Sequence, residues 1–208
     1  DVNIQSIVNK IDCPYKTVSA ISNDADYTAK NVVCSKDGVR YEFVGMDCIG
    51  RINTKIPGRF TVYNSLCAVA TLINLGFSRD NVFNACNLVD FIKGRSEIIQ
   101  TPKNFSVIID YAHTPDGLYN ILESVREFTK GRVITVFGCG GDRDKSKRAE
   151  MGRIAGNLSD IAVVTSDNPR NENPLLIIND ILCGMEKAKS RIAVIENRRQ
   201  AIEFALGK

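Results

Sequence analysis

Residues 133–148 read VITVFGCGGDRDKSKR, and this stretch decides the fold. It opens with a short run of β-branched and aromatic residues at 133–137, which is typical of a buried strand. A glycine-rich loop follows directly, and a helix is expected from about residue 147 to residue 157. Strand, loop and helix in this order predict one repeat of an α/β sheet.

The same alternation continues on both sides of this stretch. Further strands are expected at 106–109, 161–165 and 192–195, and further helices at 115–128, at 174–187 and after the last strand. Apolar strands joined by helices predict an open, mostly parallel α/β sheet. In such sheets ligands bind at the carboxyl ends of the strands.

The first half of the chain predicts strands followed by helices. Strands are expected at 32–35 and 39–44 around the hairpin signal Asp37-Gly38, and at 51–56 before Pro57-Gly58. Apolar residues at helical spacing predict a helix over 63–75, and Ser78 is expected to cap a second helix that runs to about residue 89.

A strand at 97–100 leads into the turn-rich segment Thr101-Pro102-Lys103-Asn104. A domain boundary is placed there, which divides the chain into residues 1–102 and residues 103–208. The first residue is not Met, and the last helix-like stretch has no following element to pack on. The chain is therefore expected to be part of a longer protein.

Composition favours a cytoplasmic protein that binds small molecules. Of the 208 residues, 44% are apolar and 25% charged, the net charge is +3, and basic residues do not cluster with aromatics, so nucleic acid is not an expected partner. No apolar run approaches the roughly 18 residues that a transmembrane helix needs, so a membrane is not expected either. The seven cysteines are scattered and form no CxxC pair. They predict reduced thiols, with no disulfide framework or zinc site.

Three polar clusters each begin where a predicted strand ends. They are DYAHTPD at 110–116, GCGGDRDK at 138–145 and TSDNPR at 165–170. Because the carboxyl ends of parallel strands share one edge, the clusters are expected on one rim of the sheet. Polar loops placed at random would not share this position.

The cluster at 110–116 contains His113, the only histidine of the chain. Asp110 and Asp116 lie close in sequence, and carboxylates orient and charge an imidazole, which modestly favours a functional role over a bystander at the surface. Thr114-Pro115 is also an ordinary helix start, with a threonine N-cap and proline at the first helical position.

The loop at 138–145 has neither the Walker A pattern nor GxGxxG. Its cations, and those just after it, are predicted to meet carboxylate or phosphate groups: Arg143, Lys145, Lys147 and Arg148. The alternative is a solvated basic face. A solvated basic face at this position is energetically less favourable, because cations at a helix N-terminus oppose the helix dipole.

The tetrapeptide 167–170, DNPR, has two interpretations that the residues alone favour equally. Arg170 can form two parallel hydrogen bonds to a carboxylate, while Asn168 both donates and accepts, which suits an amino-acid ligand. Asn-Pro is equally typical of a simple turn.

Five blocks in fixed order, spread over residues 57–185, together resemble the Mur ligases. They are PGRF..YN at 57–64, GRSE at 94–97, and the three clusters, extended to GCGGDRDKSKR and TSDNPR.E.P. DNPR resembles the form found in the branch of the family that adds meso-diaminopimelate. The resemblance implies the end of a central ATP-binding domain followed by a truncated, Rossmann-like C-terminal ligase domain.

The resemblance also implies an activity. It is the ATP-dependent addition of meso-diaminopimelate to UDP-N-acetylmuramoyl-L-alanyl-D-glutamate through an acyl phosphate, a step of peptidoglycan synthesis. ATP and Mg²⁺ are the implied cofactors, with the magnesium ligands mostly outside this chain. A monomer that acts on these small molecules is expected, and this chain alone should not turn over.

Roles follow from the resemblance position by position. Asn64 would face the adenine, Arg95 the ATP phosphates and Asp110 the ribose, while His113 would be a catalytic residue of the cleft. The pocket for meso-diaminopimelate would take the remaining residues, which are Arg143, Asp167, Asn168, Pro169 and Arg170.

Some residues depart from the family pattern. The family usually has asparagine where this chain has Thr61, an apolar residue where it has Ser96, and proline where it has Glu150. None of these differences removes a contact named above. The family's uridine-nucleotide domain, GKT loop, carbamylated lysine and last pocket residues have no match here. Three alternatives stay open: a lysine-adding Mur ligase, a cyanophycin-synthetase-like amide ligase, and a non-catalytic nucleotide-binding module.

Overall fold

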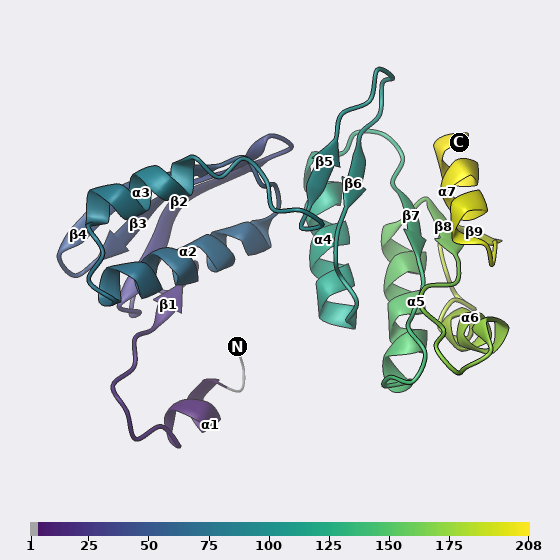
Figure 1. The fold of residues 1–208 in the computed structure, drawn as a ribbon, viewed down its shortest axis with the longest axis horizontal. Coiled ribbons are helices and arrows are strands. Elements are labelled where there is room, and N and C mark those ends of the chain that lie inside the picture. Colours follow the sequence, from purple (N-terminus) through teal and green to yellow (C-terminus); the bar gives the residue numbers. More distant parts are fainter. Residues whose placement is uncertain (1–3) are drawn as a thin grey trace. The chain divides into compact units, whose positions relative to one another are not determined.

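The computed structural model describes residues 4–208, which divide into two compact units. The first unit ends at Phe91, and the second runs from Ile92 to Lys208. Each unit has its own sheet and helices, so each is described by itself (Figure 1).

The first unit is a mostly antiparallel sheet with two helices packed on one face. Its strands are β1 (Val18–Ser19), β2 (Tyr27–Ser35), β3 (Gly38–Gly45) and β4 (Cys48–Thr54), hydrogen-bonded in that order, with only β1 and β2 parallel. The helices are α1 (Ile4–Val8), α2 (Arg59–Asn74) and α3 (Arg79–Asn87). In Figure 1, α2 and α3 lie over the sheet of β2, β3 and β4, in agreement with their contacts.

The predicted hairpin at Asp37-Gly38 is confirmed. Ser35 of β2 pairs with Gly38 of β3, and Gly38 has a φ of 132°. A Cβ atom at Gly38 would lie 2.0 Å from the Thr54 carbonyl oxygen, so only glycine lets the turn approach the end of β4.

The core of this unit follows the strand and helix periods. Val39, Tyr41 and Phe43 alternate along β3 and are all buried, as expected for a sheet covered on one face. The predicted apolar face of α2 packs on them, with Leu66, Val69 and Ala70 buried. α2 begins at Arg59, directly after Gly58, rather than at residue 63.

The second unit is built on a parallel sheet. Its strands are β5 (Glu97–Ile99), β6 (Val107–Ile109), β7 (Ile134–Phe137), β8 (Ile161–Val164) and β9 (Arg191–Val194). Its helices are α4 (Pro115–Phe128), α5 (Ser146–Leu158), α6 (Pro174–Cys183) and α7 (Arg198–Leu206). β7, β8 and β9 pair in parallel in that order, which confirms the predicted α/β class.

The central strand β8 is buried along its whole length, because helices cover both faces of the sheet. Ala201 of α7 packs against Ile161 and Val163 on one face. α5 contacts β8 and is flanked by α4 and α6 (Figure 1). Helices on both faces explain why the sequence of β8 shows no polar alternation.

The sequence expected β6 in the parallel sheet, and this detail is wrong. Within the described residues, β6 pairs antiparallel with β5, from Glu97 with Ile109 to Ile99 with Val107. The two strands are joined by a short connection, so their pairing closes a small loop at low entropic cost.

The β5–β6 pairing also bears on the division of the chain. Residue 102 lies between these two paired strands, so the boundary placed there falls inside the second unit, which begins at Ile92. The functions assigned to the two parts of the chain stay predictions. No helix within residues 4–208 is long and apolar enough to cross a bilayer.

Candidate functional site

Two of the three polar clusters begin at one edge of the parallel sheet. Phe137 of β7 pairs with Val164 of β8, and Val164 pairs with Val194 of β9, so the three strands end side by side. The loop of residues 138–145 and the loop of residues 165–173 leave the sheet from this edge. We call them the glycine loop and the DNPR loop.

The two loops are joined at Gly141 by one hydrogen bond between backbones and one from a side chain. The Gly141 N–H donates to the Asn168 carbonyl oxygen at 2.9 Å, and Arg170 Nη1 donates to the Gly141 carbonyl oxygen at 2.7 Å. A Cβ atom at Gly141 would lie 1.9 Å from the Pro169 carbonyl oxygen. The loops can therefore approach this closely only with glycine at position 141.

A second set of contacts joins the loops further along. The Asp142 N–H donates to Glu172 Oε1 at 2.6 Å, and Asp142 Oδ2 accepts from Asn171 Nδ2 at 2.8 Å. Asp142 and Arg170 both have positive φ, at 52° and 49°, which is uncommon for residues with a side chain. These conformations turn the backbone so that both pairs of contacts can form.

The prediction that Arg148 meets a ligand is wrong. Its side chain is 1% exposed, and it donates from Nη1 to Glu172 Oε2 at 3.0 Å and to Asp180 Oδ2 at 2.9 Å. Nη2 donates to Glu172 Oε1 at 2.8 Å. A guanidinium this deeply buried cannot reach a ligand. Its charge is compensated instead by the carboxylates of Glu172 and Asp180.

The other cations of this region have different surroundings. Lys145 Nζ lies 3.4 Å from Glu172 Oε2, and Lys147 Nζ donates to the His113 carbonyl oxygen at 2.8 Å. Arg143 and Arg170 are both exposed. The two arginines that the resemblance assigns to the amino acid are therefore open to solvent.

Glu172 is the carboxylate on which these contacts converge. Hydrogen bonds from Arg148, and then from the Asp142 N–H, lower the pKa of Glu172 to about 2. Hydrogen bonds to Glu172 and to Asp180 raise the pKa of Arg148 in turn, against the lowering effect of burial. Glu172 is thus an anion at neutral pH, and it offsets part of the positive charge of the arginines around it.

The other members of the DNPR tetrapeptide are held less tightly. Asp167 and Asn168 are exposed, and Arg198 Nη1 lies 3.9 Å from Asp167 Oδ1. Pro169 is half-buried, and its carbonyl oxygen accepts from the Glu172 N–H at 2.9 Å, which closes a turn. A turn and an open Arg170 side chain occur together, so the two interpretations of this motif do not exclude each other.

The third cluster, at 110–116, follows β6 and so does not leave the parallel sheet as expected. It is nevertheless tied to α5, because Lys147 donates to the His113 carbonyl. The helix-start interpretation of Thr114-Pro115 is confirmed, since Thr114 Oγ1 accepts from the Gly117 N–H at 3.1 Å at the start of α4. α4 in turn packs along α5.

The Asp110 carboxylate is already hydrogen-bonded by protein groups. Oδ2 accepts from the Ser96 N–H at 2.8 Å and from Ser96 Oγ at 3.3 Å, and Oδ1 accepts from the Ala112 N–H at 2.7 Å. Ser96 is buried, with a φ of 47°. The serine that departs from the family pattern therefore anchors Asp110.

Arg95, Tyr111 and His113 form a row of exposed side chains. The Arg95 guanidinium lies 4.7 Å from the centre of the Tyr111 ring, and the Tyr111 and His113 rings are 4.9 Å apart and meet edge to face. His113 Nδ1 is 3.0 Å from the Tyr111 carbonyl oxygen. A carbonyl oxygen only accepts, so the proton of neutral His113 lies on Nδ1 and leaves Nε2 as an acceptor.

Asn64 lies in the first unit, exposed on α2. Its predicted role therefore depends on a part of the chain that is described separately from the other candidates. The remaining departures from the family pattern have local partners. Thr61 Oγ1 donates to the Pro57 carbonyl oxygen at 3.1 Å, and Glu150 pairs with Arg153 at 2.6 Å.

Sequence reasoning missed three residues that the structure brings into the site. Ser96, Tyr111 and Glu172 all lie within the quoted blocks, but neither charge nor spacing assigned them a role. Glu172 could have been noticed as the one acidic residue in NPR.E.P. The partner of Ser96 lies 14 positions away in the chain, so no local pattern reveals that contact.

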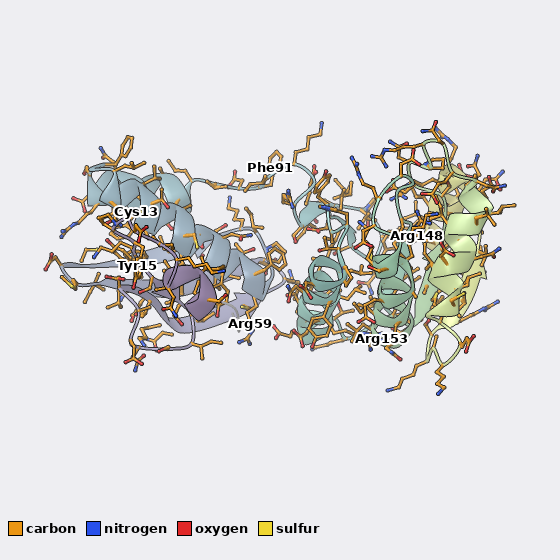
Figure 2. The ribbon with its side chains drawn as sticks, turned by 90° about the horizontal axis from the view of Figure 1, so that it is seen from below. Cys13, Tyr15, Arg59, Phe91, Arg148 and Arg153 are labelled. Atoms are coloured by element: carbon orange, nitrogen blue, oxygen red, sulfur yellow. The ribbon has the colours of Figure 1, made fainter. Side chains whose placement is uncertain are left out.

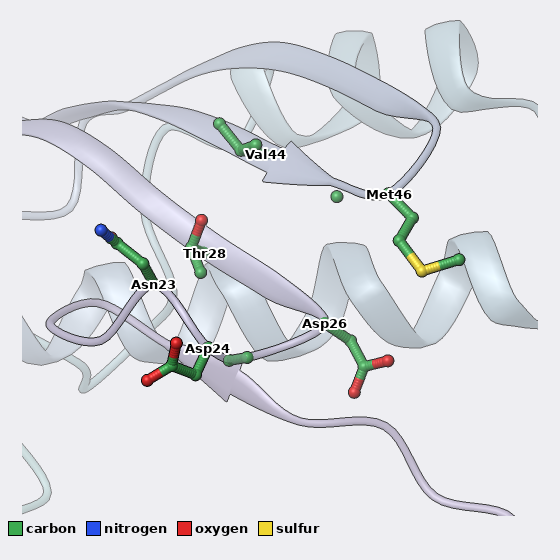
Figure 3. A pocket seen from close by; sticks show the side chains of 8 residues that line it. Asn23, Asp24, Asp26, Thr28, Val44 and Met46 are labelled. Carbon is green, nitrogen blue, oxygen red and sulfur yellow. The ribbon is translucent and has the colours of Figure 1, made fainter.

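A shallow hollow of about 400 Å³ lies on the first unit, lined by residues 23–26, 28 and 44–46 (Figure 3). It contains none of the candidate residues. Asp26 in its wall is already bound, since it accepts from the Thr17 N–H at 2.8 Å and pairs with Lys16 at 3.0 Å. The hollow therefore offers little chemistry of its own.

The seven cysteines lie among residues 4–208 as free thiols. Burial raises the pKa of Cys139 to about 11, so this thiol of the glycine loop stays protonated. Within the same residues, no three Asp, Glu, His or Cys side chains converge to hold a metal ion.

Comparison with known proteins adds to this geometry. Residues 94–208 match the family described as Mur ligase, glutamate ligase domain. A UDP-N-acetylmuramoyl-L-alanyl-D-glutamate--2,6-diaminopimelate ligase of Clostridium acetobutylicum is 45% identical over 193 residues, which is 92% of this chain and 40% of that protein. The corresponding ligase of Caldanaerobacter subterraneus is 47% identical over 186 residues, or 89% of this chain and 38% of that protein.

Solved structures of Mur ligases also align with this chain. A structure of a UDP-N-acetylmuramoyl-L-alanyl-D-glutamate--2,6-diaminopimelate ligase aligns with a TM-score of 0.56 at 31% identity over 98% of this chain and 42% of the other. MurF from Acinetobacter baumannii aligns with a TM-score of 0.71 at 16% identity, over 92% of this chain and 40% of that one, which shows likeness of fold alone. The chain spans about 40% of the length of the curated relatives it matches. The family match covers more than half of the 208 residues, and the chain therefore belongs to the Mur ligase family.

Proposed function

We propose that this chain is part of an ATP-dependent ligase that joins meso-diaminopimelate to UDP-N-acetylmuramoyl-L-alanyl-D-glutamate. One observation carries the proposal: hydrogen bonds from the Gly141 N–H to the Asn168 carbonyl and from the Arg170 side chain to the Gly141 carbonyl bring the glycine loop and the DNPR loop together at one sheet edge. The names of the relatives that align over most of the chain support the same substrate pair.

The amino acid would be recognised by charge and by hydrogen bonds. Meso-diaminopimelate carries two carboxylates, and Arg143 and Arg170 are two exposed guanidiniums on adjoining loops. Arg170 Nη1 already donates to Gly141, which fixes the guanidinium while its other N–H groups remain for a ligand. The Asn168 side-chain amide would add one donor and one acceptor.

ATP is the expected cofactor, and the residues assigned to it fit in part. Arg95 is exposed and its guanidinium is oriented by the Tyr111 ring, which suits a phosphate contact. Asp110 Oδ1 accepts one hydrogen bond, so it retains a lone pair for a ribose hydroxyl. Asn64 would face the adenine.

His113 would act on the proton of the attacking amine. Its Nε2 is the free acceptor of the neutral ring, since Nδ1 is held by the Tyr111 carbonyl. Mur ligases use Mg²⁺ together with ATP, and the metal would neutralise phosphate charge when bound. Because no suitable cluster lies within residues 4–208, we expect its ligands to come mostly from other parts of the whole protein.

The substrate assignment can be tested with the full-length protein that carries this chain. ADP release should require the muramoyl dipeptide and meso-diaminopimelate together. Lysine at the same concentration is the matched control, because it lacks the second carboxylate. Release of ADP with lysine and not with meso-diaminopimelate would refute the substrate assignment.

The site assignment calls for a pair of variants with opposite expected effects. Arg170→Ala should raise KM for meso-diaminopimelate by about 10- to 100-fold and leave KM for ATP nearly unchanged, since it removes a charged hydrogen-bond donor. Arg95→Ala should do the reverse. Arg153→Ala, which removes an exposed arginine from α5, serves as the control. If Arg170→Ala raised both constants equally, its assigned role would be wrong.

A further inference from the structure

Arg148 is buried and charged, and the ligand contacts proposed above do not use it. It lies in the first turns of α5 and projects inward, whereas Arg153 of the same helix is largely exposed (Figure 2). Its side chain is 1% exposed. A buried guanidinium is costly unless it is well paired, so its presence calls for a reason beyond packing.

The partners of Arg148 belong to the loops of the candidate pocket. Glu172, in the DNPR loop, accepts from both terminal nitrogens of Arg148, at 3.0 Å and 2.8 Å. The same carboxylate accepts from the Asp142 N–H of the glycine loop at 2.6 Å. One carboxylate thus links helix α5 to both loops.

The positions of these contacts matter for the two exposed arginines. Asp142 directly precedes Arg143, and Glu172 follows Arg170 by two residues. Arg148 Nη2 also lies 3.4 Å from the Gly140 carbonyl oxygen, at the long limit of a hydrogen bond. A planar guanidinium with two parallel bonds fixes the orientation of its partner more strictly than a point charge would.

We propose that Arg148 and Glu172 are positioning residues of the amino-acid pocket. Through Glu172, Arg148 sets the separation of the glycine loop and the DNPR loop, so that Arg143 and Arg170 meet the two carboxylates of a single amino acid. This inference rests on the proposed function. It assigns a specificity-setting role to two residues that do not themselves touch the ligand.

A purely structural role makes a different prediction, and Asp180 separates the two. Asp180 bonds the same guanidinium at 2.9 Å, but it lies in α6 and belongs to neither loop. Its side chain is about half exposed. If Arg148 only stabilised the packing of α5 on α6, losing Asp180 or Glu172 should have the same kind of effect.

The test uses the full-length protein with Glu172→Gln and Asp180→Asn as matched, nearly isosteric variants. Glu172→Gln should raise KM for meso-diaminopimelate at least about 10-fold and leave KM for ATP within about twofold, because small displacements of binding groups are costly. Asp180→Asn should leave both constants within about twofold. Arg148→Lys should recover part of the loss seen in Arg148→Met, because it keeps the charge but not the fork.

The outcomes separate the two proposals. Equal changes in KM for meso-diaminopimelate in Glu172→Gln and Asp180→Asn, or none in either, would overturn the positioning role. If the Arg148 variants do not fold, the Glu172 and Asp180 pair still decides. Should the wild type use lysine instead, the substrate assignment and the two-carboxylate part of the positioning role both fail, and KM for lysine then tests only whether Glu172 positions the loops. Should it use no amino acid, both proposals fail.

Discussion

Gly141 lies where the backbones of the glycine loop and the DNPR loop meet. Its N–H and its carbonyl group both bond the DNPR loop, and the Pro169 carbonyl oxygen occupies the space a side chain would need. This glycine is required by close approach, since the positive φ values here belong to Asp142 and Arg170. The absence of a side chain at position 141 therefore determines how closely the two loops can approach.

Gly141→Ala should destabilise the protein by about 1–3 kcal/mol, because a methyl group forced against the backbone displaces the loop. Denaturant unfolding followed by circular dichroism measures the change. Gly131→Ala is the matched control, since a Cβ atom there meets nothing within 4 Å, and it should stay within about 0.5 kcal/mol of wild type. Equal effects of the two variants would contradict the close approach.

The lowered pKa of Glu172 predicts that the stability of the protein depends on pH. Its pKa falls from the ordinary 4.5 to about 2 in the folded protein, so the carboxylate stabilises the fold above pH 4.5. That contribution is lost as the pH falls from 4.5 through 2. Glu172→Gln should thus be less stable than wild type at pH 6, and the difference should shrink as the pH approaches 2.

Unfolding free energies measured at intervals between pH 6 and pH 2 test this expectation. Glu150→Gln is the control, because Glu150 also pairs with an arginine of α5 but its side chain is 44% exposed. Exposed pairs contribute little, so this variant should follow wild type closely. A constant gap between Glu172→Gln and wild type down to pH 2 would mean that the lowered pKa does not govern stability.

The helices α3 and α4 differ in how their first turns are capped. Thr114 and Ser78 both occupy the N-cap position that the sequence assigns to a capping side chain. Only Thr114 forms the bond, to the Gly117 N–H, while the side chain of Ser78 forms no capping bond. Sequence thus located both helix starts, but not which side chain stabilises one.

Thr114→Ala should cost about 1 kcal/mol, the usual value of a lost N-cap. The same method measures Ser78→Ala, which should cost clearly less because no capping bond is removed. A larger loss for Ser78→Ala than for Thr114→Ala would show that the capping assignment is reversed.

The short strand β5 shows how elements choose partners. β6 was expected in the parallel sheet, and instead it forms a two-stranded antiparallel ladder with β5. The same pairing places the GRSE and DYAHTPD blocks together, and the Ser96 to Asp110 bonds lie just past its end. Two blocks that the sequence divided between two domains therefore lie in one unit.

Division into two units is the feature of the whole molecule that can be tested directly. A fragment of residues 92–208 should unfold in one cooperative transition, since it has its own sheet and covering helices. A fragment of residues 103–208, cut at the boundary inferred from sequence, lacks β5 and leaves β6 unpaired. It should unfold at a lower temperature, by several degrees.

Thermal unfolding by circular dichroism compares the two fragments at equal concentration. The result would contradict the contact-based division if both melted at the same temperature. It would contradict it more strongly if the shorter fragment were the more stable. Either outcome would mean that the strand pairing of β5 adds nothing to the second unit.

Much of this protein follows from its sequence. The apolar strands at 133–137 and 161–165, the amphipathic helices and the Asp37-Gly38 hairpin were all predictable, because burial and turn chemistry act within short stretches. So was the meeting of the GCGGDRDK and TSDNPR clusters at one edge, because it follows from parallel strand order alone. The ordered blocks also identified the family.

Only the tertiary structure decided which charged side chains are buried in ion pairs and which are open to solvent. Arg148 and Arg143 are both arginines near the start of α5, yet one is buried against Glu172 and Asp180 while the other is open to solvent. The partners of Arg148 lie 24 and 32 positions away in the chain. Sequence spacing cannot specify such contacts, because whether a charge is paired or free depends on which distant side chains the fold brings within a few ångströms.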